Sequence, residues 1–171
     1  MKDYKILVLI SGVILIANYC SCQIGSDDRL SLQKKPYNGN ELKIDGYYYL
    51  PDISGNITIY FFYRNGILLY GTGALPSELP NLEKSFKDGQ FYSEAKDDKT
   101  FWGVFNIDSQ NIQFDKWYSD DIGPLRTSIR SGEILNDTTF YISKSSLGNE
   151  DETYHFKQFS PKPDSITQFI P

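Results

Sequence analysis

The feature that most constrains the fold is a pair of apolar runs that meet at the dipeptide Asn65-Gly66. Residues 56–63 (NITIYFFY) alternate so that every second side chain falls on the same side of a strand, and residues 67–70 return with a similar composition. Asn-Gly fits a two-residue type I′ turn best, because both central positions of that turn require a positive φ. We therefore predict an antiparallel hairpin over residues 56–70.

Two further pairs of runs have the same organisation. Residues 100–107 and 112–118 flank a polar turn, and residues 127–135 and 138–143 flank Asn136-Asp137. One more run precedes the first hairpin and one follows the last. The predicted strands therefore cover residues 42–50, 56–63, 67–70, 100–107, 112–118, 127–135, 138–143 and 153–159. Helical spacing near Pro80 predicts at most a short helix between the third and fourth strands.

The order of these elements predicts an all-β fold of about eight strands. No long helical pattern separates the strands, so an antiparallel up-and-down meander is favoured over parallel crossovers. Closing the meander into a barrel removes its exposed edges. We predict a barrel domain over residues 41–160, with a β-sandwich as the alternative. Residues 22–40 are predicted to form a flexible tether and residues 161–171 an extended C-terminal tail.

The N-terminus has the composition of an export signal. Two lysines precede an apolar run over residues 6–17, which is shorter than the roughly 20 apolar residues needed to span a bilayer. Ser21-Cys22, at the end of this region, resembles the cleavage site of bacterial lipoproteins, in which the cysteine is acylated and becomes the mature N-terminus. The resemblance implies a signal peptide over residues 1–21 and a lipid anchor on Cys22.

The residues around this site bear on location. Cys20 follows the bulky Tyr19 and is expected to leave with the signal peptide. Residues 26–28 (SDD) resemble the tract that routes some lipoproteins to the outer membrane, although a solvated linker has the same composition. The resemblance implies a lipid-anchored protein of the bacterial cell envelope, whose partner is the membrane. A secreted or periplasmic protein cut near Cys22 is the alternative.

The start of the first predicted strand carries a second resemblance. Gly46-Tyr47-Tyr48 is similar to the Gly-x-Trp opening of lipocalin-like barrels, with Tyr48 in place of tryptophan; Lys157 stands where that family commonly has an arginine. This resemblance implies that a small apolar or aromatic molecule can bind inside the barrel. The candidate lining residues are Tyr60, Phe62, Trp102 and Trp117. The alternative is a barrel filled by its own side chains, acting as an accessory or interaction subunit of a cell-envelope complex.

Other function classes find little support in the sequence. A formal net charge of −5 without a basic cluster argues against nucleic acid as a partner. The single histidine, His155, is expected to face solvent, and no metal-ligand set or cofactor-binding loop is apparent. We therefore expect no enzyme, no metal and no cofactor. The tripeptides Asp137-Thr138-Thr139 and Asp164-Ser165-Ile166 resemble bacterial O-glycosylation sites, and turn chemistry explains them equally well.

Overall fold

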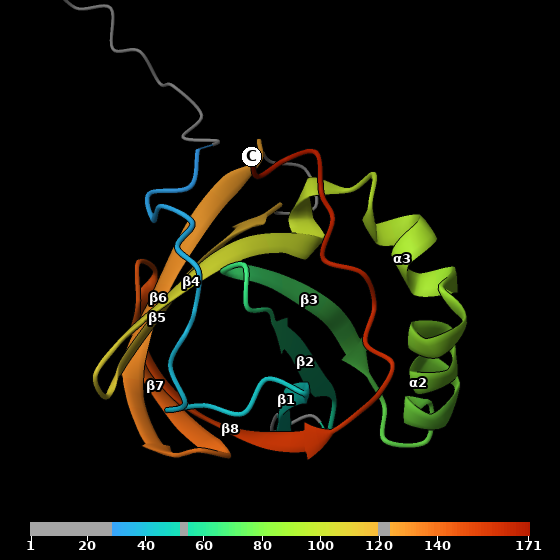
Figure 1. Ribbon diagram of the computed structural model, residues 1–171, viewed down its shortest axis with the longest axis horizontal. Coiled ribbons are helices and arrows are strands. Elements are labelled where there is room, and N and C mark those ends of the chain that lie inside the picture. Colours follow the sequence, from blue (N-terminus) through green and yellow to red (C-terminus); the bar gives the residue numbers. More distant parts are fainter. Residues whose placement is uncertain (1–28, 52–54, 120–123) are drawn as a thin grey trace, which may run out of the picture.

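The structure, a computed structural model, describes residues 29–51, 55–119 and 124–171 (Figure 1). Antiparallel strands follow one another in chain order around a closed barrel, and the last strand pairs with the first. The predicted all-β meander is confirmed, and the sheet closes as a barrel, not as a sandwich. The strands are β1 (Gly46–Pro51), β2 (Ile57–Phe62), β3 (Ile67–Ala74), β4 (Trp102–Asp108), β5 (Asn111–Tyr118), β6 (Arg126–Asn136), β7 (Thr139–Ser145) and β8 (Gly148–Gln158).

Two short helices connect β3 to β4 and lie along one side of the barrel (Figure 1). The helix α2 (Leu79–Asp88) has Pro80 in its first turn, as the sequence predicts, and ends at Gly89, where φ is +81°. The helix α3 (Gln90–Ala95) and the 3-10 turn η1 (Lys99–Phe101) follow. A helix of six residues is too short to display a helical period, so the sequence did not predict α3.

The first hairpin has a different turn from the predicted one. Gly66 has a φ of +83°, but Asn65 is not among the described non-glycine residues with positive φ, so the turn is not type I′. The Gly66 N–H donates to the Tyr63 carbonyl over 2.9 Å, and the Asn65 side-chain oxygen accepts from the Ile67 N–H over 3.1 Å. These contacts fit a type I turn followed by a left-handed glycine, which needs positive φ at one residue only.

The ends of several strands also differ from the predicted ones. β8 begins at Gly148, not at residue 153, because Gly148 pairs with Ser145 of β7 and the ladder continues through polar residues. Those residues have no apolar alternation, so the sequence pattern did not predict this part of the strand. β1 begins at Gly46, and the residues before it form an irregular segment instead of strand.

The alternation of side chains along the strands produces two separate apolar clusters. Phe62 of β2 and Phe140 of β7 lie 5.8 Å apart between ring centroids although their strands are not neighbours, so their cluster occupies the barrel interior. The buried members of this interior cluster are Tyr37, Leu42, Tyr48, Tyr60, Phe62, Leu68, Phe105, Ile112, Phe114, Ile134, Phe140, Ile142 and Tyr154.

The second cluster, the outer cluster, lies between the barrel wall and the segments that cover it. Phe61 on the outer side of β2 packs against Phe86 of α2 with ring centroids 5.0 Å apart, and Phe86 packs against Phe91 of α3. The buried members are Tyr47, Ile59, Phe61, Tyr63, Ile67, Leu69, Phe86, Phe91, Ala95, Trp102, Val104, Trp117, Phe159 and Ile170. The helices therefore cover apolar positions that would otherwise face solvent.

Residues 161–171 contain no helix or strand and run alongside the same outer face (Figure 1). The Tyr63 hydroxyl donates to the Pro163 carbonyl over 2.8 Å, and the Tyr92 hydroxyl donates to the Ile166 carbonyl over 2.9 Å. Ile170 is buried in the outer cluster. The C-terminal segment is thus part of the folded unit.

The described part of the expected tether also lies against the barrel. The backbone N–H groups of Ser31 and Leu32 donate to the buried Asp115 carboxylate over 2.6 and 3.2 Å, and Tyr37 is buried in the interior cluster. Residues 29–40 are therefore held in place, because they offer apolar side chains and backbone donors that the barrel wall accepts. The predicted signal peptide, Cys20, Cys22 and residues 26–28 lie outside the described residues.

Candidate functional site

One half of the barrel interior is filled by aromatic rings. Phe62 lies 4.9 Å from Phe105 and 5.6 Å from Tyr48, measured between ring centroids, and most of these contacts are edge-to-face. The rings of Phe140 and Tyr154 are stacked 4.7 Å apart. We call the part formed by Tyr48, Phe62, Phe105, Phe114 and Phe140 the closed half; its rings contact one another across the barrel and are closely packed.

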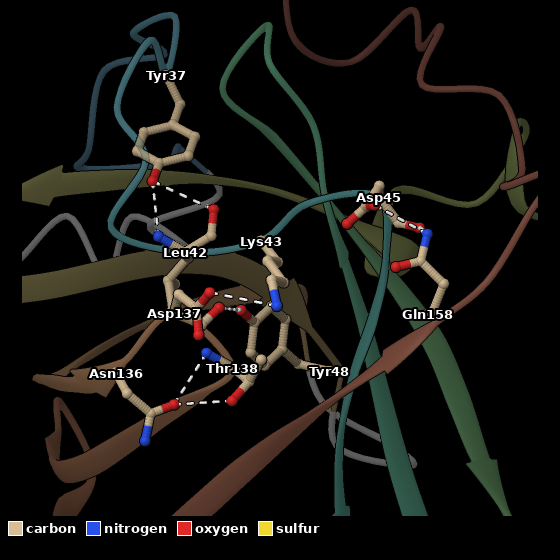
Figure 2. A network of polar contacts seen from close by, with 9 residues as sticks. All are labelled: Tyr37, Leu42, Lys43, Asp45, Tyr48, Asn136, Asp137, Thr138 and Gln158. Carbon is tan, nitrogen blue, oxygen red and sulfur yellow. Dashed lines mark hydrogen bonds and ion pairs between the residues drawn. The ribbon is translucent and has the colours of Figure 1, made fainter.

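The end of the closed half is covered by residues 37–45. The Tyr37 hydroxyl accepts from the Leu42 N–H over 2.8 Å, and the Lys43 N–H donates to the Asp137 carbonyl over 2.8 Å (Figure 2). The Tyr48 hydroxyl donates to the same carbonyl over 3.0 Å, and the Lys43 ammonium lies 3.2 Å from the Asp137 carboxylate. These contacts join the N-terminal segment to the turn between β6 and β7.

The lysine that supports this end is not the one suggested by the lipocalin-like pattern. Lys157 lies on the outer face, 5.8 Å from the centre of the Tyr47 ring and 2.7 Å from Glu83. Lys162 of the C-terminal segment instead donates to the carbonyls of Ile44 and Phe62 over 2.6 and 2.8 Å. The difference arises because Lys157 is one of the residues of β8 whose side chains face outward.

The opposite half of the interior contains a cavity of about 290 Å³, which we call the open-end cavity. Most of its lining residues, like Tyr60 of β2, face the barrel interior. Several of them are partly exposed at the barrel mouth. The lining residues are Thr58, Tyr60, Tyr70, Lys116, Tyr118, Ser128, Arg130, Leu147, Glu152 and Tyr154. This half of the barrel is therefore hollow and polar where the closed half is solid and apolar.

A polar network occupies one wall of the open-end cavity. Arg130 of β6 donates to and pairs with the Glu152 carboxylate of β8, and both side chains are about one-fifth exposed, at 22% and 19%. The Tyr154 hydroxyl donates to Glu152 over 2.9 Å and accepts from Arg130 over 3.3 Å. Burial raises the pKa of Tyr154 far above its usual range, so its hydroxyl keeps the proton that it donates to Glu152 even well above neutral pH.

Lys116 of β5 enters the cavity from another side. Its ammonium donates to the Trp117 carbonyl over 3.0 Å and lies 4.7 Å from the centre of the Tyr70 ring. Burial lowers the pKa of Lys116 to about 8; nearby Arg130 acts in the same direction, and Asp98 opposes them. At neutral pH the cavity therefore contains a cation whose charge is disfavoured by its surroundings.

Aromatic rings form the floor of the cavity. The Tyr60 ring centroid lies 5.5 Å from that of Tyr70 and 5.7 Å from that of Tyr154, with Phe114 of the closed half 5.3 Å away. Burial raises the pKa of Tyr60 and of Tyr70, so both rings stay uncharged at neutral pH. The floor can pack against a planar group while the wall supplies charged hydrogen-bonding groups.

The structure separates the four candidate lining residues. Tyr60 lines the open-end cavity, whereas Phe62 lies in the closed half among other rings. Trp102 and Trp117 lie in the outer cluster: the Trp102 indole N–H donates to the Ala95 carbonyl over 2.7 Å, and Lys99 lies 4.5 Å from the Trp117 ring. Residue type alone selected these tryptophans, and the alternation of β4 and β5 turns both of them outward.

Sequence reasoning missed the charged residues of the cavity, although a signal for Lys116 was present. In β5 the inward positions carry Ile112, Phe114, Lys116 and Tyr118. A charged residue that shares the alternation of buried apolar residues marks a polar site inside the barrel. Arg130 and Glu152 lie in strands without clear apolar alternation, so their inward direction follows only from the pairing with neighbouring strands.

A larger hollow of about 570 Å³ lies on the outer face between the N-terminal and C-terminal segments, and Trp117 is among its lining residues. It opens beside Arg29, where the described part of the chain begins. This hollow lies outside the barrel wall, between two segments without helix or strand, so we place the candidate site in the open-end cavity, which lies inside the barrel.

His155 and the metal-ligating residue types of the described chain lie apart from the open-end cavity or do not form a metal site. His155 is exposed on the outer face of β8, with its ring 6.0 Å from that of Tyr49. Within residues 29–51, 55–119 and 124–171, no group of three or more His, Cys, Asp or Glu side chains could hold a metal ion. No helix in that part of the chain is long and apolar enough to cross a membrane.

Both glycosylation-like tripeptides lie at partly exposed positions. The Thr138 hydroxyl donates to the Asn136 side chain over 2.8 Å, and the Ser165 hydroxyl accepts from the Asn65 amide over 3.2 Å. Their modification stays a prediction.

Comparisons with known proteins give no match: no family model, no curated protein and no solved structure matches this chain.

Proposed function

We propose that this chain is an exported lipoprotein, anchored to the bacterial envelope through acylated Cys22, whose barrel binds a small ligand in the open-end cavity. The observation that supports ligand binding is the contrast within one interior: half is packed solid, and the other half keeps about 290 Å³ between polar and aromatic side chains. A small eight-stranded barrel can be filled throughout by its own side chains, so a hollow of this size is not a geometric necessity.

The size and lining of the cavity indicate the kind of ligand. Sites for drug-sized molecules commonly span about 300–1,000 Å³, so a cavity of about 290 Å³ suits a compact molecule. The Tyr60 and Tyr70 rings favour a ring-bearing ligand over a flexible chain, because flat groups pack well against aromatic faces. The ligand is held at the barrel mouth, since Phe114 and Phe62 occupy the interior below it.

Native mass spectrometry of the purified protein tests the proposal. We expect a co-purifying small molecule on the wild-type protein and on Ser131→Phe, whose side chain lies on the outward alternation of β6. We expect its loss from Ser128→Phe, because Ser128 is buried and lines the cavity. Equal occupancy of the two variants would place the ligand elsewhere, and a wild-type protein that retains no molecule and binds none from a small-molecule library would contradict the proposal.

The anchor has its own test. In cells that process lipoproteins, we expect Cys22→Ala to move the protein from the membrane fraction to the soluble fraction. Cys20→Ala, two residues away, is the matched control and is expected to leave the protein in the membrane fraction. A Cys22→Ala protein that stayed with the membranes would contradict the assignment of the anchor.

The solid closed half supports the second candidate function, a non-enzymatic accessory or interaction subunit of an envelope complex. In that case the barrel is a rigid scaffold and binding takes place on its outside. Retrieval of a stoichiometric envelope protein from cross-linked cells, together with an unoccupied cavity, would favour this second candidate over the first.

A further inference from the structure

The open-end cavity carries an excess of positive charge. Its lining contains Lys116 and Arg130 as cations and Glu152 as the one acid among the described lining residues. Glu152 is already engaged with Arg130 and with the Tyr154 hydroxyl. Lys116 contacts the Trp117 carbonyl and the Tyr70 ring, and neither of them carries a formal charge. The charges of the lining residues therefore sum to one positive charge, while Asp98, an exposed residue outside the lining, partly offsets the charge of Lys116.

Such an arrangement is costly for a protein without a ligand. A partly buried cation loses hydration, and a carbonyl and a ring replace only part of it. Arg130 adds repulsion, since it acts on Lys116 in the same direction as burial. An anion that enters the cavity would offset both costs, whereas an uncharged molecule of equal shape would offset neither.

We propose, on the basis of the ligand-binding function proposed above, that the open-end cavity selects a small monoanion with a planar ring, of the aromatic carboxylate class. The carboxylate contacts the Lys116 ammonium and the Arg130 guanidinium, which also pairs with Glu152. The ring lies against Tyr60 and Tyr70, whose centroids are 5.5 Å apart. The tyrosine hydroxyls around it act as neutral hydrogen-bonding groups.

The charge of the lining also distinguishes a carboxylate from a phosphate. Lys116, Arg130 and Glu152 sum to one positive charge, which a monoanion balances. A phosphate monoester carries a charge between about −1.5 and −2 at neutral pH and would leave a negative excess beside Glu152. The same arithmetic makes Glu152 the residue that limits how much negative charge the cavity accepts.

The experiment compares two isosteric probes, 2-naphthoate and its uncharged amide, 2-naphthamide, by isothermal titration calorimetry at pH 7 with the wild-type protein. We expect the carboxylate to bind at least about 10-fold more tightly, because charge-assisted hydrogen bonds are roughly twice as strong as neutral ones. Equal affinities for the two probes would overturn the anion inference while leaving the cavity as a ligand site. Binding of neither probe at millimolar concentration would overturn this inference, and together with an empty wild-type cavity it would overturn the proposed function as well.

Substitutions then identify the residue whose positive charge binds the carboxylate. Lys116→Gln is expected to weaken 2-naphthoate at least about 10-fold and to leave 2-naphthamide unchanged. Lys144→Gln removes the same charge from an exposed position on β7 and is the matched control, expected to change neither affinity. A Lys144→Gln variant as weak as Lys116→Gln would overturn the inference, because the effect would then be one of overall charge.

Glu152→Gln tests the inference through an expected gain in affinity, which a damaged fold would not produce. It removes the competing carboxylate while its amide can still accept from Tyr154, so we expect 2-naphthoate to bind several-fold more tightly than to the wild type. It should also admit phenyl phosphate, an anion of higher charge. Weaker binding of 2-naphthoate by a folded Glu152→Gln protein would contradict the placement of the anion beside Arg130.

Discussion

The two halves of the barrel interior share several strands and differ in almost every property of their side chains. Along β5, Phe114 belongs to the closed half, whereas Lys116 and Tyr118 line the open-end cavity. The change from solid to hollow therefore takes place within a single strand. It shows that alternation decides which side chains face inward, while the chemistry of each inward residue decides whether the space is filled.

The largest expected effect concerns the difference in packing between the closed half and the open-end cavity. Phe62→Ala should lower the free energy of unfolding by about 3–5 kcal/mol, because it leaves a void among rings that contact it from several strands. Tyr70→Ala at the partly exposed floor of the cavity should cost less than about 2 kcal/mol, since solvent can enter there. Urea denaturation of the two variants measures the difference. Equal losses would contradict the division into a solid and a hollow half.

Two partly buried lysines extend the comparison, because burial lowers the pKa of each to about 8. Lys162 donates to two backbone carbonyls at the closed half, so Lys162→Met should lower the free energy of unfolding by about 2 kcal/mol. Lys116→Met in the open-end cavity should leave it unchanged or raise it, since the substitution removes a poorly compensated charge. Thermal unfolding of both variants in parallel checks the sign of each effect.

The dependence of stability on pH follows from the same lysines. Their folded pKa of about 8 lies below the ordinary value of 10.5, so the unfolded chain binds more protons between these values and stability rises with pH there. We expect a gain of about 1–2 kcal/mol between pH 8 and 9, flattened in the Lys116→Met/Lys162→Met protein.

Above about pH 10 the direction reverses. Burial raises the pKa of Tyr47, Tyr60 and Tyr63, so these hydroxyls ionise first in the unfolded chain. The stability that they contribute is complete below their unfolded pKa of 10 and is lost as the pH rises toward their folded values. A denaturation series at fixed ionic strength should therefore show a maximum between pH 9 and 10, and a monotonic fall from pH 7 would contradict the burial of the lysines.

The smallest expected effect concerns the cover of the closed half. Tyr48→Phe removes the hydroxyl that donates to the Asp137 carbonyl and should cost about 1 kcal/mol. Tyr118→Phe, at the mouth of the open-end cavity, is the matched control and should cost less than about 0.5 kcal/mol because solvent reaches this position. Hydrogen exchange of the Lys43 amide, which donates to the same carbonyl as Tyr48, provides a local measurement of the closed-half cover. Unchanged exchange in Tyr48→Phe would show that the cover does not depend on this hydroxyl.

The sequence was sufficient for the architecture because barrel closure depends on strand alternation and short turns, which are local patterns. It was insufficient for the site because Lys116, Arg130 and Glu152 come from three strands, and only the register between strands brings them to one level of the barrel. Trp102 shows the converse: its residue type suggested a ligand site, but its place in the alternation of β4 turns it toward Ala95 in the outer cluster. Local patterns thus predicted the wall of the barrel and not the content of its interior.

The attachment of Ser31 and Leu32 to Asp115 determines how the barrel would respond to mechanical load. A pull transmitted from an N-terminal anchor reaches these backbone groups before it reaches Tyr37 and the cover of the closed half. Asp115 lies on β5, which is paired along its length with both β4 and β6, so the force enters the wall through a strand that cannot be peeled from an edge. With the anchor proposed on Cys22, a pull on the N-terminal segment would therefore enter the side of the barrel at β5 and not one of its two ends.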